Sequence, residues 1–233
     1  PPVLVREQAL FGTGMLPDTE QQIYRVPDDE LFLAGTSEVP LASLHAGEIV
    51  GPGELPLRYA GFSSCFRREA GAAGKDTQGI FRVHQFDKVE MFAFVEPEES
   101  VAEHERLLAI EEEILQALGI PYRVVNIAVD DLGYSAAKKY DLEAWLPGQG
   151  RFRELTSCSN TTDFQARRLN IRFRPPEDFP AFGQPVLAPA DGVVVRAHGR
   201  ERDHRSRSSW PSLLYLFAEG SLRELTGPGR VLG

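Results

Sequence analysis

Cysteine, positive net charge and long apolar runs are all scarce in this sequence, and each shortage argues against a class of protein. Cys65 and Cys158 are its only cysteines, too few for a disulfide framework and without the close spacing of a zinc motif. Lys and Arg total 25 against 34 Asp and Glu, and the net charge of −9 argues against a surface that is basic throughout, although a local basic patch remains compatible. No apolar run approaches the ~20 residues that cross a bilayer. We therefore expect a protein of the reducing cytoplasm without a membrane partner.

The composition is that of a folded globular protein. Hydrophobic residues make up 42% and charged residues 25% of the 233 positions, and the length suits one large domain or two small ones. The chain opens with Pro1-Pro2-Val3, without an initiator Met or a charged-then-apolar leader. We therefore expect no signal peptide, and we expect the chain to be a piece of a longer protein.

Residues 1–174 are predicted to form one domain in which strands are interleaved with few helices, a pattern that favours an α+β fold over a regular βαβ fold. One helix is predicted over residues 97–118, where apolar residues recur at three- and four-residue steps before Gly119, and a second over 135–145. The apolar row of the first helix is Leu107, Ile110, Ile114 and Leu118, flanked by Leu108 and Leu115. The predicted strands are Glu30–Leu33, Arg58–Phe62, Phe81–Val83, Lys88–Phe94, Tyr122–Val129 and Arg151–Ser157.

The strand at 88–94 carries an unusual carboxylate. Alternation places Lys88, Glu90, Phe92 and Phe94 on one face of it, so a Glu lies among aromatic residues. Either that face is solvated or it lines a site.

The sequence changes character at about residue 175. Prolines crowd residues 175–189, and an Arg-, His- and Ser-rich run follows over 196–209. Such a composition resists regular structure. We expect residues 175–233 to be a separate tail that is disordered or comes from a shifted reading frame.

Three segments hold more functional residue types than a fold needs. In the first, residues 34–40, the hydroxyl of Thr36 and the carboxylate of Glu38 could hold an amino group and a small polar side chain. The alternative is a plain helix start, with Thr36 or Ser37 as the N-cap and Glu38 in the first turn.

The second segment, residues 65–90, has two strand-like arms around a Gly- and Ala-rich loop. Arg67 and Glu69 lie on one arm, and Arg82, His84 and Glu90 on the other. Arg offers a fork of donors that matches phosphate oxygens, whereas the alternative is a hairpin with surface charges.

The third segment, residues 153–168, is a dense row of hydroxyls, an amide and carboxylates. Glu154 and Ser157 could hold Mg²⁺ and the phosphates that it bridges, because hard oxygen ligands suit this ion. Alternatively, Asn160 to Asp163 form a plain turn, and Arg167 and Arg168 lie on a solvated helix face.

Together the three segments resemble class II aminoacyl-tRNA synthetases, most closely seryl-tRNA synthetases, over about residues 1–174. Phe66-Arg67-Arg68-Glu69 resembles the start of class motif 2, and Arg82-Val83-His84-Gln85-Phe86 resembles its return strand. Thr36-Ser37-Glu38 is similar to the serine-recognition triplet. The run Arg153 to Asn160, continued by Phe164-Gln165-Ala166-Arg167-Arg168, is similar to a segment specific to this family.

The resemblance implies an antiparallel sheet flanked by helices, with the active site on one face, and ATP and Mg²⁺ as cofactors. It assigns the catalytic roles to Arg67 and Glu154, and the Mg²⁺ ligands are Glu154 and Ser157. The implied ATP-binding residues are Arg67, Arg68, Glu69, Val83, His84, Gln85, Phe86, Glu154, Leu155, Thr156 and Ser157. The implied serine-binding residues are Thr36, Ser37, Glu38, Arg67, Glu90 and Asn160.

The implied reaction activates serine with ATP to seryl-adenylate and then transfers the seryl group to the 3′ end of tRNA(Ser), whose acceptor end would meet the loop Gly71–Gly79. The parent enzyme would be a homodimer. The N-terminal tRNA-binding arm, most of motif 1 and the end of motif 3 have no counterpart here, so we expect this chain alone to be inactive or impaired.

Two other hypotheses stay open. One is a related ligase that loads an amino acid onto a carrier protein and uses a zinc site, for which Cys65 and Cys158 would be candidate ligands; buried structural thiols are the favoured interpretation of these cysteines. The other is a non-catalytic remnant that binds nucleotide without turnover.

Overall fold

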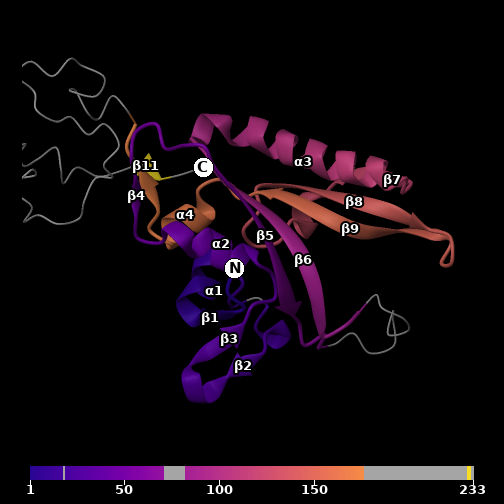
Figure 1. Ribbon diagram of the computed structural model, residues 1–233, viewed down its shortest axis with the longest axis horizontal. Helices are drawn as coiled ribbons and strands as arrows, with labels where there is room; N and C mark the ends of the chain where they lie inside the picture. The colour runs from indigo at the N-terminus through magenta and orange to yellow at the C-terminus, as the bar shows by residue number, and fades with distance from the viewer. Residues whose placement is uncertain (18, 71–81, 176–229, 232–233) are drawn as a thin grey trace, which may run out of the picture.

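The computed structural model describes residues 1–17, 19–70, 82–175 and 230–231, and Figure 1 shows its ribbon. The strands are β1 (Leu4–Arg6), β2 (Arg25–Val26), β3 (Leu31–Leu33), β4 (Ile49–Val50), β5 (Leu57–Phe66), β6 (Gln85–Phe94), β7 (Tyr122–Asn126), β8 (Lys138–Leu146), β9 (Arg151–Asn160), β10 (Arg172–Phe173) and β11 (Arg230–Val231). The α-helices are α1 (Glu7–Thr13), α2 (Glu38–Ala42), α3 (Ser100–Ala117) and α4 (Phe164–Arg168). Short 3₁₀ turns lie at Glu20–Gln22, Pro27–Asp29, Ser43–His45, Pro97–Glu99 and Val129–Asp131.

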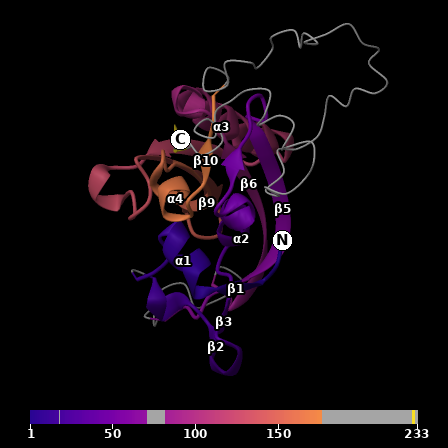
Figure 2. The ribbon, with the colours of Figure 1, turned by 90° about the vertical axis from the view of Figure 1, so that its left-hand side faces the viewer.

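Antiparallel pairing dominates the architecture. β5 and β6 form a long hairpin that pairs from Leu57 opposite Phe94 to Phe66 opposite Gln85, and β7, β8 and β9 form a meander. Figure 1 shows α3 lying along this meander, and Figures 1 and 2 both show α1, α2 and α4 side by side next to the β5–β6 hairpin. The expected α+β fold, an antiparallel sheet arrangement flanked by helices, is confirmed.

The long helix lies where the sequence predicts it. A 3₁₀ turn at Pro97–Glu99 leads into α3, and Gly119, at φ +67°, ends it. The backbone N–H groups of Gly119 and Ile120 donate to the carbonyls of Gln116 and Leu115, the pair of bonds that closes a Schellman C-cap. A left-handed residue is required there, which explains the glycine.

The predicted buried face of α3 is wrong in part. Leu108 and Leu115 pack with Leu142 of β8, whereas Ile114 and Leu118 are 51% and 65% exposed. The helix turns a mixed stripe to the strands instead, and Nε2 of buried His104 in this stripe donates a hydrogen bond to the Cys158 carbonyl of β9. The stripe that faces the strands thus combines a polar contact with apolar ones.

The predicted helix over 135–145 is also wrong, because residues 138–146 form the central strand β8. Its backbone pairs with β7 on one side and β9 on the other, and Leu142 and Ala144 on one face are buried. Local preference for helix in the Ala- and Lys-rich start of this segment is overridden by two ladders of hydrogen bonds and by burial.

The predicted strands at 30–33, 58–62, 88–94 and 151–157 are observed with shifted ends, and the other two differ more. Arg82 and Val83 are not in a strand, Phe81 lies outside the described residues, and β6 begins only at Gln85. β7 ends at Asn126, and a 3₁₀ turn takes up Val129–Asp131.

The N-terminal part packs closely on the rest of the domain. A Cβ added to Gly12 of α1 would lie 2.2 Å from Cδ2 of Leu169, just after α4, so glycine permits this approach. Apolar residues of α2, β4, β6 and β10 join the same core, including Ala42, Val50, Phe94 and Phe173.

The expected tail lies almost wholly outside the described residues. The exception is β11, whose Arg230 and Val231 pair antiparallel with Phe173 and Arg172 of β10. The division at residue 174 stays a prediction. Within the described part of the chain, no helix is long and apolar enough to cross a membrane.

Candidate active site

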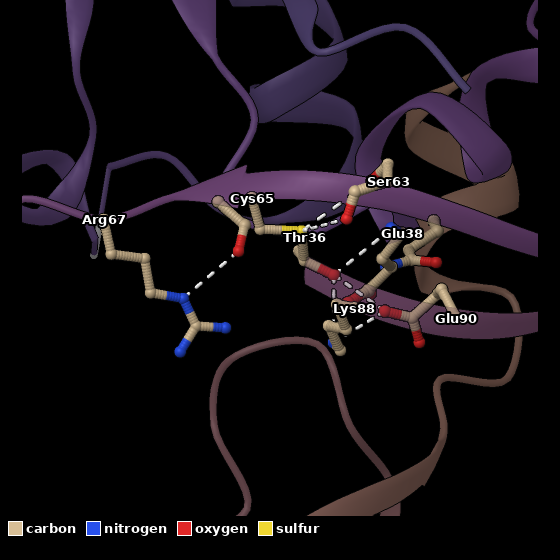
Figure 3. A network of polar contacts seen from close by, with 9 residues as sticks. Thr36, Glu38, Ser63, Cys65, Arg67, Lys88 and Glu90 are labelled. Carbon is tan, nitrogen blue, oxygen red and sulfur yellow. Dashed lines mark hydrogen bonds and ion pairs between the residues drawn. The ribbon is translucent and has the colours of Figure 1, made fainter. Parts of the chain in front are cut away.

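The first cluster centres on the hydroxyl of Thr36, in the turn between β3 and α2 (Figure 3). Its Oγ1 donates to Oε2 of Glu90 at 2.7 Å and accepts from the backbone N–H of Glu38 at 3.2 Å. It also accepts from Nζ of Lys88 at 3.1 Å. Two segments that are 54 residues apart in the sequence therefore meet at one 5% exposed hydroxyl.

Of the two interpretations of the 34–40 segment, the helix start is confirmed, and the binding role stays a prediction. A helix does begin at Glu38, and Thr36 supplies an acceptor for one N–H of its first turn. The same hydroxyl also joins the carboxylate cluster. Ser37 is fully buried, and its Oγ has no hydrogen bond within the described structure.

The cluster carries two carboxylates and one ammonium group. Nζ of Lys88 lies 2.6 Å from Oε2 of Glu90, and Nε2 of buried Gln165 on α4 donates to Oε1 of Glu38 at 2.7 Å. Loss of hydration raises the pKa of Glu38 above 4.5, and the charge of Glu90 raises it further, against the opposing effects of Gln165, Lys88 and Arg67. Glu90 on this face of β6 therefore contacts a partly buried polar cluster rather than open solvent, and its role in a binding site stays a prediction.

The second cluster follows β5. The Arg67 guanidinium lies 5.1 Å from the ring centroid of Phe86, and its Nε donates to the Gly35 carbonyl at 3.1 Å. Glu69, in the left-handed region at φ +51°, accepts from Nη1 of Arg82 at 2.7 Å. Gly35 precedes Thr36, so Arg67 links the two clusters.

Residues that the sequence analysis missed support the ends of both arms. Nε2 of Gln22 donates to the Ala70 carbonyl at 2.9 Å, and Oε1 of Gln22 accepts from the Ala70 N–H at 3.2 Å. The backbone carbonyl of Gln22 accepts from the backbone N–H of Arg68. The Tyr24 hydroxyl lies 2.9 Å from Nδ1 of exposed His84. No local pattern marks Gln22 or Tyr24, because their partners are about 50 residues away.

The other residues of the predicted return strand are placed beside this cluster. Val83 and Phe86 are half-buried, whereas His84 and Gln85 are exposed, and the His84 carbonyl accepts from the Arg67 N–H at 3.0 Å. The loop Gly71–Gly79, predicted to meet tRNA, lies outside the described residues.

A β-bulge arranges the third cluster on β9. Residues three apart in a regular strand point to opposite faces. Here Ser157 pairs with Asp141, but Glu154 pairs with Glu143, because the register shifts between Leu142 and Glu143. Since Asp141 and Glu143 share a face of β8, Glu154 and Ser157 share it too.

The remaining residues of this row face differently. Thr156 donates to Oε2 of Glu111 on α3 at 2.9 Å, so its side chain points to the helix and away from the Glu154 face. Leu155, at the bulge, is 54% exposed. Loss of hydration raises the pKa of Glu111 above 4.5.

Glu154 and Ser157 suit a hard cation. One carboxylate and one hydroxyl on an exposed strand face are oxygen ligands, and so small a protein set fits Mg²⁺, which is held largely by water and substrate phosphates. Within the described ranges, no group of three His, Cys, Asp or Glu side chains could hold a metal ion by itself.

Asn160 is the last residue of β9 and leads into a turn. Its Oδ1 accepts from the Thr162 N–H at 2.8 Å, as the turn interpretation of residues 160–163 expects. Both cysteines are free and buried, and burial raises the pKa of the Cys158 thiol to about 12. Both thiols are thus buried, as expected, and their structural role stays a prediction.

Comparison with known proteins identifies the family of this chain. The model of the tRNA synthetase class II core domain (G, H, P, S and T) matches residues 23–181, more than half of the sequence. The chain therefore belongs to the class II tRNA synthetase core family.

Within that class, the similarity is to serine–tRNA ligases. The chain is 60% identical to the serine–tRNA ligase of Thermobifida fusca over 182 residues. This aligned region covers 78% of this chain and 43% of that protein. The crystal structure of seryl-tRNA synthetase from Pyrococcus horikoshii complexed with ATP matches with a TM-score of 0.74 and 59% identity, over 76% of this chain and 40% of that one. The serine-tRNA ligase of Naegleria fowleri in complex with AMP matches with a TM-score of 0.71 and 43% identity, over 74% of this chain and 41% of that one. The resemblance to seryl-tRNA synthetases is thereby confirmed, and the chain spans less than half the length of these relatives.

Proposed function

We propose that this chain carries the serine-activating core of a seryl-tRNA synthetase. The observation that carries the proposal is the convergence of Thr36, Glu38 and Glu90 beside Arg67, because it joins an ammonium- and hydroxyl-binding cluster to a phosphate-binding fork. The similarity to serine–tRNA ligases supports it. We propose a cytoplasmic location and, for the longer parent protein, a homodimer.

The amino acid would bind at the Thr36 cluster. Glu38 and Glu90 carry two negative charges against one on Lys88, so the cluster favours a cationic ammonium group. A pocket that hydrogen-bonds the serine hydroxyl rejects alanine, because alanine would leave buried polar groups unpaired. The Ser37 hydroxyl has no described hydrogen bond and the printed side-chain bond of Asn160 is to nearby Thr162, so these two residues would act through the backbone and the turn.

The nucleotide would bind across the second and third clusters. Arg67 would hold the α-phosphate, Glu69 the adenine amine, and Phe86 would offer its ring to the base, with Arg68 and Val83 to Gln85 around them. Glu69 is bonded to Arg82 in this structure, so a nucleotide would share or replace that contact. Glu154 and Ser157 would hold Mg²⁺, which neutralises phosphate charge when bound.

In the proposed reaction, a carboxylate oxygen of serine forms a bond to the α-phosphorus as the bond to pyrophosphate breaks. Positioning and charge stabilisation by Arg67 would lower the barrier, without a covalent enzyme intermediate. A ribose hydroxyl at the tRNA 3′ end would then take the seryl group and release AMP.

Thermal unfolding with ATP, Mg²⁺ and serine tests the proposal. A ligand at about a hundredfold excess over its dissociation constant stabilises the folded chain by ~2.7 kcal/mol. The variant Arg67→Lys should lose most of the response to ATP. Arg168→Lys is the matched control, because its guanidinium lies 5.0 Å from the Phe164 ring, much as Arg67 lies over Phe86.

The outcomes separate the hypotheses. Stabilisation by ATP and serine with little serine-dependent ATP–pyrophosphate exchange is expected, because the chain spans under half of its relatives. A normal exchange rate would contradict the predicted impairment. Nucleotide binding without any response to serine would favour the non-catalytic remnant. A response to neither ligand would contradict the proposed function.

A further inference from the structure

The ammonium group of Lys88 already contacts the oxygen atoms that, under the proposed function, would bind the substrate ammonium. Its Nζ lies 2.6 Å from Oε2 of Glu90 and 3.1 Å from Oγ1 of Thr36 (Figure 3). These are an anion and a hydroxyl acceptor, which is the environment that an α-ammonium group also requires. A lysine ammonium and an amino-acid ammonium therefore compete for one place.

The hydrogen bonds of Thr36 make this competition strict. A hydroxyl has one donor and two acceptor positions. Thr36 donates to Glu90, accepts from the Glu38 N–H and accepts from Lys88, so all three positions are in use. A substrate ammonium can bond to Thr36 only when Lys88 withdraws.

The charges explain what the lysine contributes before substrate arrives. Burial raises the pKa of Glu38, and the nearby charge of Glu90 raises it further, because two carboxylates without a cation repel each other. Lys88 supplies that cation. Its side chain is 35% exposed and has a long rotatable stem, so it can leave towards solvent without unfolding the strand.

We propose that Lys88 is a placeholder for the substrate ammonium and thereby a specificity-determining residue of this pocket. The empty pocket keeps its carboxylates paired with Lys88, and a ligand enters by exchanging its own ammonium for that of the lysine. A ligand without an ammonium group cannot make this exchange. The inference rests on the proposed function, since it takes the Thr36 cluster as the amino-acid pocket.

Acetylation of lysine tests the exchange directly. The chain has four lysines, so the rate at each can be followed by mass spectrometry with acetic anhydride as the probe. Lys138 is the matched control, because it is 40% exposed and ion-paired with Glu105 at 2.9 Å, outside the cluster. The ligands are L-serine, ethanolamine, which has the ammonium and hydroxyl groups, and 3-hydroxypropionate, which lacks the ammonium.

We expect serine and ethanolamine to raise the acetylation rate of Lys88 severalfold. 3-Hydroxypropionate should leave the Lys88 rate unchanged, and none of the three ligands should change the rate at Lys138. Without ligand, Glu90→Gln should raise the Lys88 rate, because the ion pair is lost. Calorimetry on the same samples reports whether serine binds. If serine binds and the Lys88 rate falls or stays constant, the placeholder is overturned while the proposed function stands. If serine does not bind, the proposed function and the placeholder fail together for this chain.

Discussion

At the scale of single residues, Glu38 is a buried carboxylate whose pKa is raised by its surroundings in the Thr36 cluster. Its carboxylate receives a hydrogen bond from Gln165 and faces Glu90 and Lys88. Burial nevertheless raises its pKa, so the folded protein holds this carboxylate at a cost. Such a cost is expected where a residue is kept for binding rather than for stability.

The variant Glu38→Gln should make the stability of the chain less dependent on pH. A raised folded-state pKa means that the folded chain binds more protons than the unfolded chain above about pH 4.5, so wild-type stability falls as pH rises through that window. Glutamine removes this loss and keeps an oxygen for Gln165. Urea unfolding of wild type and Glu38→Gln between pH 4 and 8 measures how the free energy of unfolding depends on pH.

Glu113→Gln, on the exposed side of α3, is the control for that comparison and should run parallel to wild type. The same Glu38→Gln variant should lose its stabilisation by serine. Equal pH slopes for wild type and Glu38→Gln would contradict the assigned burial cost.

At the scale of elements, contacts between distant segments hold the site in shape. The hairpin β5–β6 is tied to α3 by Arg58 and Glu103, whose side chains form two hydrogen bonds of 2.7 and 2.8 Å. Helices α1 and α4 meet at Gly12 and Leu169. These contacts position the strand that carries Lys88 and Glu90 and the helix that carries Gln165.

Arg58→Met should lower the midpoint of thermal unfolding at pH 7. The hydrogen bond from Arg58 lowers the pKa of Glu103 below 4.5, so the pair stabilises the fold above that pH, and the contribution disappears as pH falls through the folded-state value. The difference from wild type should therefore shrink in acid. Arg106→Met, whose contact with Glu103 is longer at 3.3 Å, should have a smaller effect.

Gly12→Ala should destabilise the chain. The new Cβ would lie 2.2 Å from Cδ2 and 2.7 Å from Cγ of buried Leu169, and overpacking of this kind costs about 1–3 kcal/mol. Better helix propensity returns up to about 1 kcal/mol, so we expect a net loss of about 1 kcal/mol in urea unfolding.

Gly148→Ala is the matched control, since a Cβ there meets no atom within 4 Å and the variant should unfold like wild type. Adding Leu169→Ala to Gly12→Ala should cost less than Leu169→Ala costs alone. A Gly12→Ala variant as stable as wild type would show that the helices separate freely.

At the scale of the whole molecule, the described core lies within residues 5–173, whereas the relatives are more than twice as long as the part that this chain matches. All three clusters of buried apolar residues lie between Val5 and Phe173. The chain nevertheless spans less than half of the serine–tRNA ligases that it resembles. We therefore expect that this chain can fold without having the complete activity of the longer proteins.

A chain ending at Pro175 should unfold cooperatively within a few degrees of the 233-residue chain. The truncation removes the two-residue pairing of β11 with β10 and no member of the buried clusters. Circular dichroism melts compare the two. Loss of cooperativity in the shorter chain would contradict the predicted division at residue 174.

The sequence by itself determined the features that depend on neighbouring residues. Local pattern predicts the end of α3 at Gly119 and the alternation that places Lys88 and Glu90 on one face of β6. It also contains the sequence motifs around Arg67 and Glu154. The family could be recognised from these motifs because each motif is a short contiguous segment of the sequence.

Only the tertiary structure decided the features that depend on partners far along the chain. Residues 138–146 have local helix preference, yet pairing with two strands makes them β8. The bulge that aligns Glu154 with Ser157 arises from the pairing of β9 with β8. The bond from Gln165 to Glu38 joins residues 127 positions apart, and the bond from Lys88 to Thr36 joins residues 52 positions apart. Periodicity reports which face a side chain occupies, whereas its contacts depend on which segment packs against that face.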